Sequence, residues 1–235
     1  MWSMLPLAQY APQHMRHALG SADICFQNRF LSQYFSHGNV HPIFRSHKSP
    51  HGGLFQPAFS RLPGLLDKGA LIHIFPEGRV HQHPMHQMRY FKWGVARLLL
   101  ETETPPAVVP IWFEGFEEIM HEERSFPRFL PRVGKKVVMV FGNEVAAERW
   151  ERYRERWRKL RERYGDGSEE LRTGKEATML RIELTAEVRN EVEKLRRARG
   201  WPEEDPGAGL AETYKEPGME QKEGKLKDGS LVKDT

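Results

Sequence analysis

The sequence has few of the features that define several common protein classes. Its 235 residues include a single cysteine, Cys25, which excludes an internal disulfide and a zinc site built from several cysteines. Cys25 lies between Ile24 and Phe26, so we expect a buried and unreactive thiol. No apolar run approaches the roughly 20 residues that a membrane-spanning helix requires, and no signal-peptide pattern follows Met1.

Two catalytic motifs are also absent. Without Gly-x-Ser-x-Gly there is no nucleophile turn of a serine hydrolase, and without Gly-x-x-x-x-Gly-Lys the common nucleotide-binding loop is excluded. Hydrophobic residues make up 39% of the chain, enough for a core, while charged residues make up 29%. The net charge of +4 indicates a partner with an anionic surface, either nucleic acid or anionic lipid.

The most informative motif follows an apolar stretch at residues 70–74. The stretch predicts a buried strand, and Phe75-Pro76-Glu77-Gly78-Arg79 then forms a turn at its carboxyl end. Open α/β sheets bind ligands at that end of their strands. Arg79 offers a planar set of donors suited to phosphate, and Gly78 allows the backbone to approach a ligand closely.

Residues 1–145 are predicted to form one α/β domain. The expected strands cover 41–45, 70–74, 107–113 and 136–141. The expected helices lie within 1–38, over 53–67 and from Met88 to about Leu99. We interpret the aromatic stripe of the first segment as core; it comprises Phe26, Phe30, Leu31, Tyr34 and Phe35. Strands that alternate with helices predict a mixed sheet covered by helices.

Residues 146–200 are densely charged and predict a helical hairpin with a break at 165–167. Trp150 and Trp157 belong to an aromatic stripe on its first helix, which either packs inside the protein or lies in the interface of an anionic membrane. Residues 201–235 have few large apolar side chains and are expected to be disordered.

A histidine cluster, His81-x-His83-x-x-His86, precedes the amphipathic helix. Three imidazoles bind zinc only when their geometry converges. Pro84 interrupts the cluster and no carboxylate accompanies it at helical spacing, so we expect a solvated loop and predict no metal or other cofactor.

Several blocks of the sequence resemble the glycerolipid acyltransferases, and among these the tafazzins. The blocks are Ile24–Asn28, His73–Gly78, Arg89–Gly94, Val109–Ile111 and Ser125–Phe129. The resemblance implies an acyltransferase-like α/β fold and a transacylase that moves acyl chains between phospholipids and lysophospholipids without coenzyme A. It also implies cardiolipin remodelling on mitochondrial membranes, by a peripheral or monotopic protein that faces the intermembrane space.

The family carries a His-x4-Asp pair whose histidine is the general base. No Asp in this chain has a His five positions before it, and His17 and Asp23 are one residue too far apart. The opening Met1–Pro6 resembles the family sequence just after the pair, so we expect the segment that carries the pair to be missing from this chain. No residue is therefore assigned as catalytic.

The resemblance implies lipid-binding roles for Arg45, Phe75, Pro76, Glu77, Gly78 and Arg79. The two arginines would hold the lipid phosphate, and Glu77 would orient an acceptor hydroxyl or brace an arginine. The expected partners are phospholipid, lysophospholipid and an anionic membrane surface. Two alternatives remain open: a non-catalytic lipid-binding remnant, or a coenzyme A-dependent lysophospholipid acyltransferase. Nucleic-acid binding is not expected, because the basic residues of the charged helix alternate with acidic ones.

Overall fold

The computed structural model describes residues 15–45, 49, 52–121 and 130–214, and the backbone of 223–225 and 231–233. Contacts divide the chain into two compact units, each built from three separate segments. The first unit contains Met1–Pro76, Trp93–Pro106 and Trp150–Ile182, and the second contains Glu77–Lys92, Ala107–Arg149 and Glu183–Thr235. The domain boundaries expected near residues 145 and 200 stay predictions.

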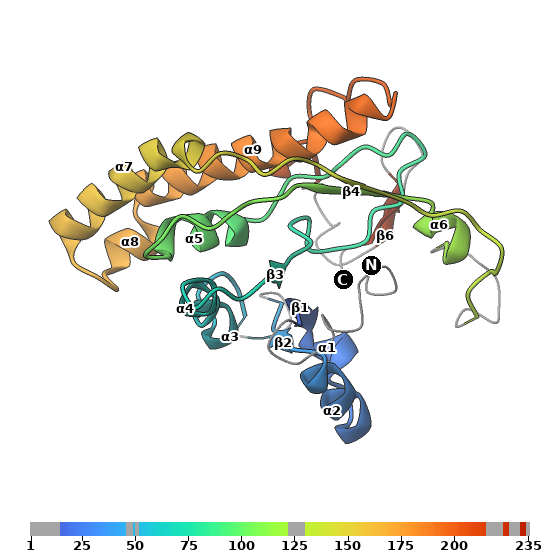
Figure 1. The fold of residues 1–235 in the computed structure, drawn as a ribbon, viewed down its shortest axis with the longest axis horizontal. Helices are drawn as coiled ribbons and strands as arrows, with labels where there is room; N and C mark the ends of the chain where they lie inside the picture. The colour runs from blue at the N-terminus through green and yellow to red at the C-terminus, as the bar shows by residue number, and fades with distance from the viewer. Residues whose placement is uncertain are drawn as a thin grey trace. The chain divides into compact units, whose positions relative to one another are not determined.

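The first unit contains a three-stranded parallel sheet (Figure 1). Its strands are β1 (His17–Ser21), β2 (Val40–Ile43) and β3 (Ile72–His73). The order is β2-β1-β3, with Ser21 beside Ile43 and Ala18 beside His73. This parallel sheet and the helices around it confirm the predicted α/β class.

The first unit also contains several short helices. They are α1 (Ala22–Cys25), α2 (Arg29–His37), α3 (Pro57–Ser60), α4 (Leu62–Leu66), α5 (Gly94–Glu101) and α8 (Glu169–Thr173). Phe59, Leu62 and Leu98 form the buried centre, and Leu19 of β1 and Ile72 of β3 pack against it. The burial of these side chains from α3, α4 and α5 is the main force that holds the helices to the sheet.

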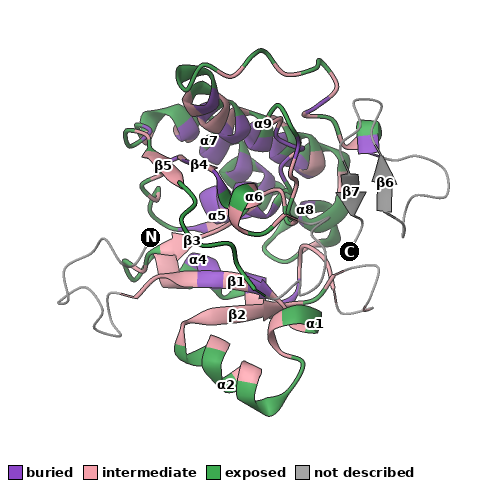
Figure 2. Ribbon diagram, turned by 90° about the vertical axis from the view of Figure 1, so that its right-hand side faces the viewer, coloured by how far each residue is buried: buried purple, intermediate pink, exposed green. Residues whose placement is uncertain are grey.

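Helix α2 differs from its expected role. Asn28 caps its first turn by accepting the Leu31 N–H at 2.9 Å, as an N-cap residue does. The aromatic stripe, however, is not core: Phe30 is 75% exposed and Tyr34 is 68% exposed. Figure 2 shows α2 in the colours of exposed and intermediate residues, with no buried residue. The periodicity is that of an amphipathic helix, but nothing in the described part of the chain covers its apolar face.

The amphipathic helix expected from Met88 begins only at Gly94. Met88 and Phe91 are buried, as their spacing predicts, but residues 88–93 are not helical. Carboxylates and a guanidinium from distant parts of the second unit bind the backbone of Met88 and Arg89, so the polar groups of these two residues are satisfied without a helix. Helix α5 begins at Gly94. This position requires glycine, because a Cβ there would lie 2.7 Å from the ring of Phe59.

The second unit contains an antiparallel pair of strands, which matches two of the predicted strands. β4 (Ile111–Glu114) pairs with β5 (Val138–Phe141), and α6 (Phe116–Ile119) follows β4. Gly115 joins β4 to α6 with φ of +90°, and a Cβ there would lie 2.1 Å from the carbonyl oxygen of Lys136. Only glycine fits this connection.

Two long helices form the predicted charged hairpin (Figure 1). They are α7 (Glu148–Tyr164) and α9 (Lys175–Ala198). They run antiparallel, because Arg149 near the start of α7 pairs with Glu187 at 2.9 Å, and Arg163 at its end pairs with Glu176 at 3.1 Å. Trp150 is fully buried and Trp157 is 4% exposed, so the aromatic stripe of α7 packs inside the protein. The membrane-facing alternative for this stripe is therefore wrong.

The tail is ordered over residues 201–214, which differs from the expected disorder. The 3₁₀ helix η4 (Ala211–Tyr214) ends in a buried tyrosine, whose hydroxyl donates to the Ala208 carbonyl at 3.0 Å. Beyond it, β6 (Glu223–Lys225) pairs with β7 (Leu231–Lys233). A few polar contacts order residues 201–214, although this stretch contains little apolar surface.

Over the ranges that the structure describes, we find no helix that combines the length and the apolar character needed to cross a bilayer.

Arg154 ties α7 to the end of α5 within the first unit. Its guanidinium is buried and donates to the carbonyls of Leu99, Thr102 and Glu103 and, at 2.9 Å, to the Thr102 hydroxyl. Arg154 thereby satisfies carbonyls at the end of α5 that have no partner within their own helix.

We expect Arg154→Met to lower the free energy of unfolding by about 3 kcal/mol, because it leaves several buried carbonyls without donors. Arg158→Met, on an exposed position of the same helix that pairs with Glu151, is the control and should cost less than about 1 kcal/mol. Urea unfolding of the two variants measures the difference. Equal losses would show that the contacts of Arg154 do not stabilise this unit.

Candidate functional site

Three segments of the chain follow the carboxyl ends of the parallel strands. Asp23 follows β1, Arg45 follows β2, and Phe75 follows β3. The chain places β2 on one side of β1 and β3 on the other, so β1 borders the point where the strand order reverses. Open α/β sheets bind their ligands outside this point. The first unit therefore places Arg45 and the start of the predicted turn at the edge of the sheet that is used for binding.

The loop after β2 is held in place by two polar side chains. Arg45 forms an ion pair with Asp23, with 3.4 Å between the charged atoms, and its side chain is 14% exposed. Gln56 accepts the Phe44 N–H at 2.7 Å and donates to the Phe44 carbonyl at 3.2 Å. Neither Asp23 as a partner of Arg45 nor Gln56 was foreseen from the sequence. Both contacts join residues more than ten positions apart, which no local pattern reveals.

His73 and Phe75 lie together where β3 ends. Their rings are 4.7 Å apart, and Phe75 is 61% exposed. Burial lowers the pKa of His73 to about 4, and the charge of Arg16 adds to the effect. A general base works best when its pKa lies near the working pH. His73 is therefore poorly suited to replace the base of the absent His-x4-Asp pair.

Glu77 is held inside the second unit. Its carboxylate accepts the backbone N–H of Arg89 at 3.0 Å. Burial raises the pKa of Glu77 from 4.5 to about 7, although this hydrogen bond and the charges of Arg189 and Arg89 act in the opposite direction. Glu77 therefore braces the turn against the segment before α5; its expected roles, to orient an acceptor hydroxyl or to brace an arginine, stay predictions.

A network of charged groups surrounds this carboxylate. Arg189 donates to the carbonyls of Met88 and Arg89, at 2.6 and 2.9 Å, and pairs with Glu204. The guanidinium of Arg89 lies 4.0 Å from the centre of the Tyr214 ring. Burial raises the pKa of Tyr214 to about 12, so its hydroxyl remains neutral and donates a hydrogen bond. Through these buried side chains, the network holds the turn in place.

The side chain of Lys92 lies against Gly78 of the turn. Gly78 has φ of +69°, a conformation that favours glycine. A Cβ at this position would lie 2.7 Å from Cε and 2.9 Å from Nζ of Lys92. Lys92 is an exposed residue, and its side chain lies across the turn. Its ammonium group adds positive charge beside Gly78 and Arg79.

Arg45 and Arg79 belong to different units. Arg45 lies at the edge of the parallel sheet, whereas Arg79 is a half-buried residue of the turn that Glu77 anchors. A cradle formed by the two arginines together stays a prediction. Pro76 ends the first unit, and Glu77 begins the second.

The three histidines of the predicted cluster, His81, His83 and His86, take part in ring contacts. His86 lies 4.1 Å from the Trp201 ring and 3.6 Å from a carboxylate oxygen of Glu117, and His81 lies 5.7 Å from His83. No group of three His, Cys, Asp or Glu residues in the described ranges is arranged to hold a metal ion.

Comparisons with known proteins point to one family. The family model described as Acyltransferase matches residues 1–114. The tafazzin of Saccharomyces cerevisiae is 34% identical over an alignment of 247 positions, which covers 88% of this chain and 65% of the yeast protein. The N-acylphosphatidylethanolamine synthase of Arabidopsis thaliana is 34% identical over 148 residues, which cover 62% of this chain and 50% of that protein. The chain thus spans one half to two thirds of these curated relatives.

The chain belongs to the acyltransferase family. Within that family it is a tafazzin-type member: the protein of Dictyostelium discoideum named Taffazin is also 34% identical, over 63% of this chain and 50% of its own length. These matches confirm the family that the short sequence blocks indicated.

Glu77 predicts a specific dependence of stability on pH. A carboxyl group whose pKa is raised by folding stabilises the protein fully below the pKa of the unfolded chain and loses that contribution as the pH rises through the folded value. For Glu77 this window runs from 4.5 to about 7. The loss at high pH is about 3 kcal/mol, from the free-energy value of one pKa unit.

Glu77→Gln keeps an acceptor for the Arg89 N–H but cannot ionise. We therefore expect this variant to gain stability relative to the native protein between pH 5 and pH 8, measured by urea unfolding at both values. Glu118→Gln, at an exposed position of the same unit, is the control and should show no such change. A constant difference between Glu77→Gln and the native protein would contradict the assignment.

Proposed function

We propose that this protein is part of a phospholipid–lysophospholipid transacylase that remodels the acyl chains of cardiolipin without coenzyme A. The observation that supports this most is the anchored Phe75–Arg79 turn at the end of a parallel strand. The acyltransferase family of the chain and its similarity to tafazzins give the reaction class.

In this proposal the turn binds the head group of the lipid. Arg79 and Lys92 present positive charge at Gly78, whose backbone the Lys92 side chain covers, and the proposal keeps Arg45, in the loop after β2, as a second phosphate-binding guanidinium. Guanidinium groups bind phosphate oxygens through short, charge-assisted hydrogen bonds. Glu77 holds the turn in place from behind.

Acyl transfer also requires a base that takes the proton of the acceptor hydroxyl. The 235 residues contain no His-x4-Asp pair, and the low pKa of His73 makes it a weak base. The proposal therefore assigns lipid binding, and not proton abstraction, to the residues described above.

We also propose that the protein acts at the surface of a mitochondrial membrane, as a peripheral or monotopic protein facing the intermembrane space. Helix α2 supports a membrane contact, because Phe30 and Tyr34 stand one helical turn apart on its exposed face. Aromatic side chains on an amphipathic helix insert at the boundary between head groups and acyl chains. Arg29 at the start of α2 adds a positive charge suited to anionic lipid.

The reaction is tested by mixing the protein with phosphatidylcholine that carries a labelled acyl chain and with monolysocardiolipin. The proposal predicts labelled cardiolipin without coenzyme A. Product that forms only from added acyl-CoA would instead favour the coenzyme A-dependent enzyme. Lysophospholipid binding without product would favour the non-catalytic lipid-binding protein.

Binding of the head group is tested separately with Arg79→Ala. We expect the change to weaken binding of lysophospholipid by about 1–3 kcal/mol, the usual value of a charge-assisted contact. Arg132→Ala removes the same charge from an exposed position of the same unit and is the control. Calorimetric titration with a lysophospholipid below its micelle concentration measures both; equal affinities for the two variants would exclude Arg79 from the head-group site.

The contact through α2 is tested with the double substitution Phe30→Ser and Tyr34→Ser. Since both rings are exposed, the fold should be retained while co-flotation with cardiolipin-containing vesicles falls several-fold. Leu210→Ser, which alters another exposed apolar residue (54% exposed), is the control. Flotation of the double variant at the native level would rule out α2 as a membrane contact.

A further inference from the structure

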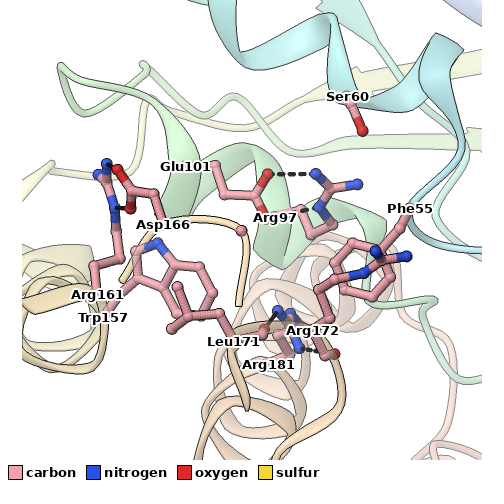
Figure 3. A pocket seen from close by; sticks show the side chains of 11 residues that line it. Phe55, Ser60, Arg97, Glu101, Trp157, Arg161, Asp166, Leu171, Arg172 and Arg181 are labelled. Atoms are coloured by element: carbon pink, nitrogen blue, oxygen red, sulfur yellow. Dashed lines mark hydrogen bonds and ion pairs between the residues drawn. The ribbon is translucent and has the colours of Figure 1, made fainter. Parts of the chain in front are cut away.

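A pocket with a volume of about 360 Å³ lies inside the first unit (Figure 3). Residues of α3, α5, α7, α8 and α9 line it, together with the loop before α3 and the loop between α7 and α8. Its charged lining residues are Arg97, Glu101, Arg161, Asp166, Arg172 and Arg181. Pockets of this size accommodate small ligands. The four guanidinium groups and two carboxylates leave an excess of two positive charges.

Two of the four arginines are neutralised. Arg97 forms two hydrogen bonds with Glu101, one of them at 2.7 Å, and Arg161 forms two with Asp166, at 2.5 and 2.7 Å. Figure 3 shows both pairs as dashed contacts at the wall of the pocket. These ion pairs fix the shape of the lining and leave its excess charge to the other two arginines.

Arg172 and Arg181 pair with no carboxylate in the part of the chain that the structure describes. Arg181 is 1% exposed, and its terminal nitrogens donate to the carbonyls of Leu171 and Arg172 at the end of α8. The guanidinium of Arg172 lies 5.1 Å from the centre of the Phe55 ring. The charge of Glu101 acts on Arg181 but forms no ion pair with it, and a buried cation that lacks an ion pair attracts an anion.

Two buried donors in the same pocket also lack acceptors. Nε of Arg181 and Nε1 of Trp157 are shielded from solvent and make no hydrogen bond to any described residue. Trp157 is 4% exposed, and the guanidinium of Arg181 lies 5.2 Å from the centre of its ring. Burial lowers the pKa of Arg181 to about 10, so this arginine remains charged at neutral pH. Buried donors without acceptors are rare in folded proteins.

We propose that this pocket binds a phosphate monoester, whose oxygens accept hydrogen bonds from Nε of Arg181, the indole N–H of Trp157 and the guanidinium of Arg172. A phosphate monoester carries close to two negative charges at neutral pH, which matches the excess charge of the lining. Its oxygens can accept from several donors at once, as the three groups around the pocket require. A carboxylate would supply one charge and two oxygens only.

The phosphate has two possible sources: a small soluble phosphate ester, or the head group of phosphatidic acid. Both present the same chemical group to the pocket. The proposal does not depend on the transacylase proposal, because none of its residues belongs to the turn at Phe75. Failure of either proposal leaves the other standing.

The first experiment follows the indole N–H signal of Trp157 by ¹⁵N NMR while glycerol 3-phosphate is added to the protein. Substitution Trp157→Phe assigns the signal. We expect a saturable shift, because the N–H gains an acceptor, and a weaker response to acetate. Absence of a saturable shift with glycerol 3-phosphate would overturn the proposal and leave Arg181 with the structural role of capping α8.

Two matched variants then separate a specific site from general attraction. Arg172 is exposed, so Arg172→Gln should fold normally and weaken glycerol 3-phosphate binding by about tenfold or more, the usual effect of losing a charged hydrogen bond. Arg163→Gln removes the same charge from α7 outside the pocket, where Arg163 pairs with Glu176, and should bind within about twofold of the native protein. Equal weakening by both variants, or none by Arg172→Gln, would contradict the proposal.

Vesicles of phosphatidylcholine with and without phosphatidic acid identify the source of the phosphate. If phosphatidic acid vesicles displace glycerol 3-phosphate from the native protein, the pocket accepts a lipid head group. If they do not, while glycerol 3-phosphate binds, the ligand is a soluble phosphate ester. Both results support a phosphate site.

Discussion

The hydrogen bond from the Arg89 N–H to the carboxylate of Glu77 is the constraint on which the proposed lipid site depends. It joins the turn after β3 to the segment before α5, and Arg189 and Glu204 bind the same segment from its other side. These contacts satisfy the backbone groups of Met88 and Arg89, and residues 88–93 are not helical; Lys92, in the same segment, lies across Gly78. A buried network of charges thus supports the turn that is proposed to bind the lipid head group.

The two arginine-rich regions of the molecule differ in what balances their charge. Around Glu77, the guanidinium groups of Arg89 and Arg189 are used by backbone carbonyls, an aromatic ring and carboxylates. In the pocket of the first unit, Arg172 and Arg181 have no carboxylate among the described residues. The first arrangement fixes a backbone; the second is suited to a bound anion. Surplus charge by itself, evident from the composition, does not distinguish the two.

The accuracy of the sequence-based predictions depended on how local the determining interactions are. The charged hairpin and its break at 165–167 were predicted from the sequence, because α7 and α9 each carry a long periodic pattern and a glycine-rich break follows the first helix. Residues 88–93 were predicted as helix and are not, because side chains far along the chain bind their backbone. The stripe of α2 has the spacing of a core helix, yet Phe30 and Tyr34 are exposed. The site motif was found from the sequence, but its support by Arg89, Lys92 and Arg189 required the structure.

Hydrogen exchange with and without a bound lysophospholipid tests the central claim most directly. If the turn holds the lipid head group, the backbone amides of Phe75 to Val80 will exchange more slowly when the lipid is bound, together with those that follow β2 near Arg45. Protection confined to other segments, with unchanged exchange across this turn, would contradict the account.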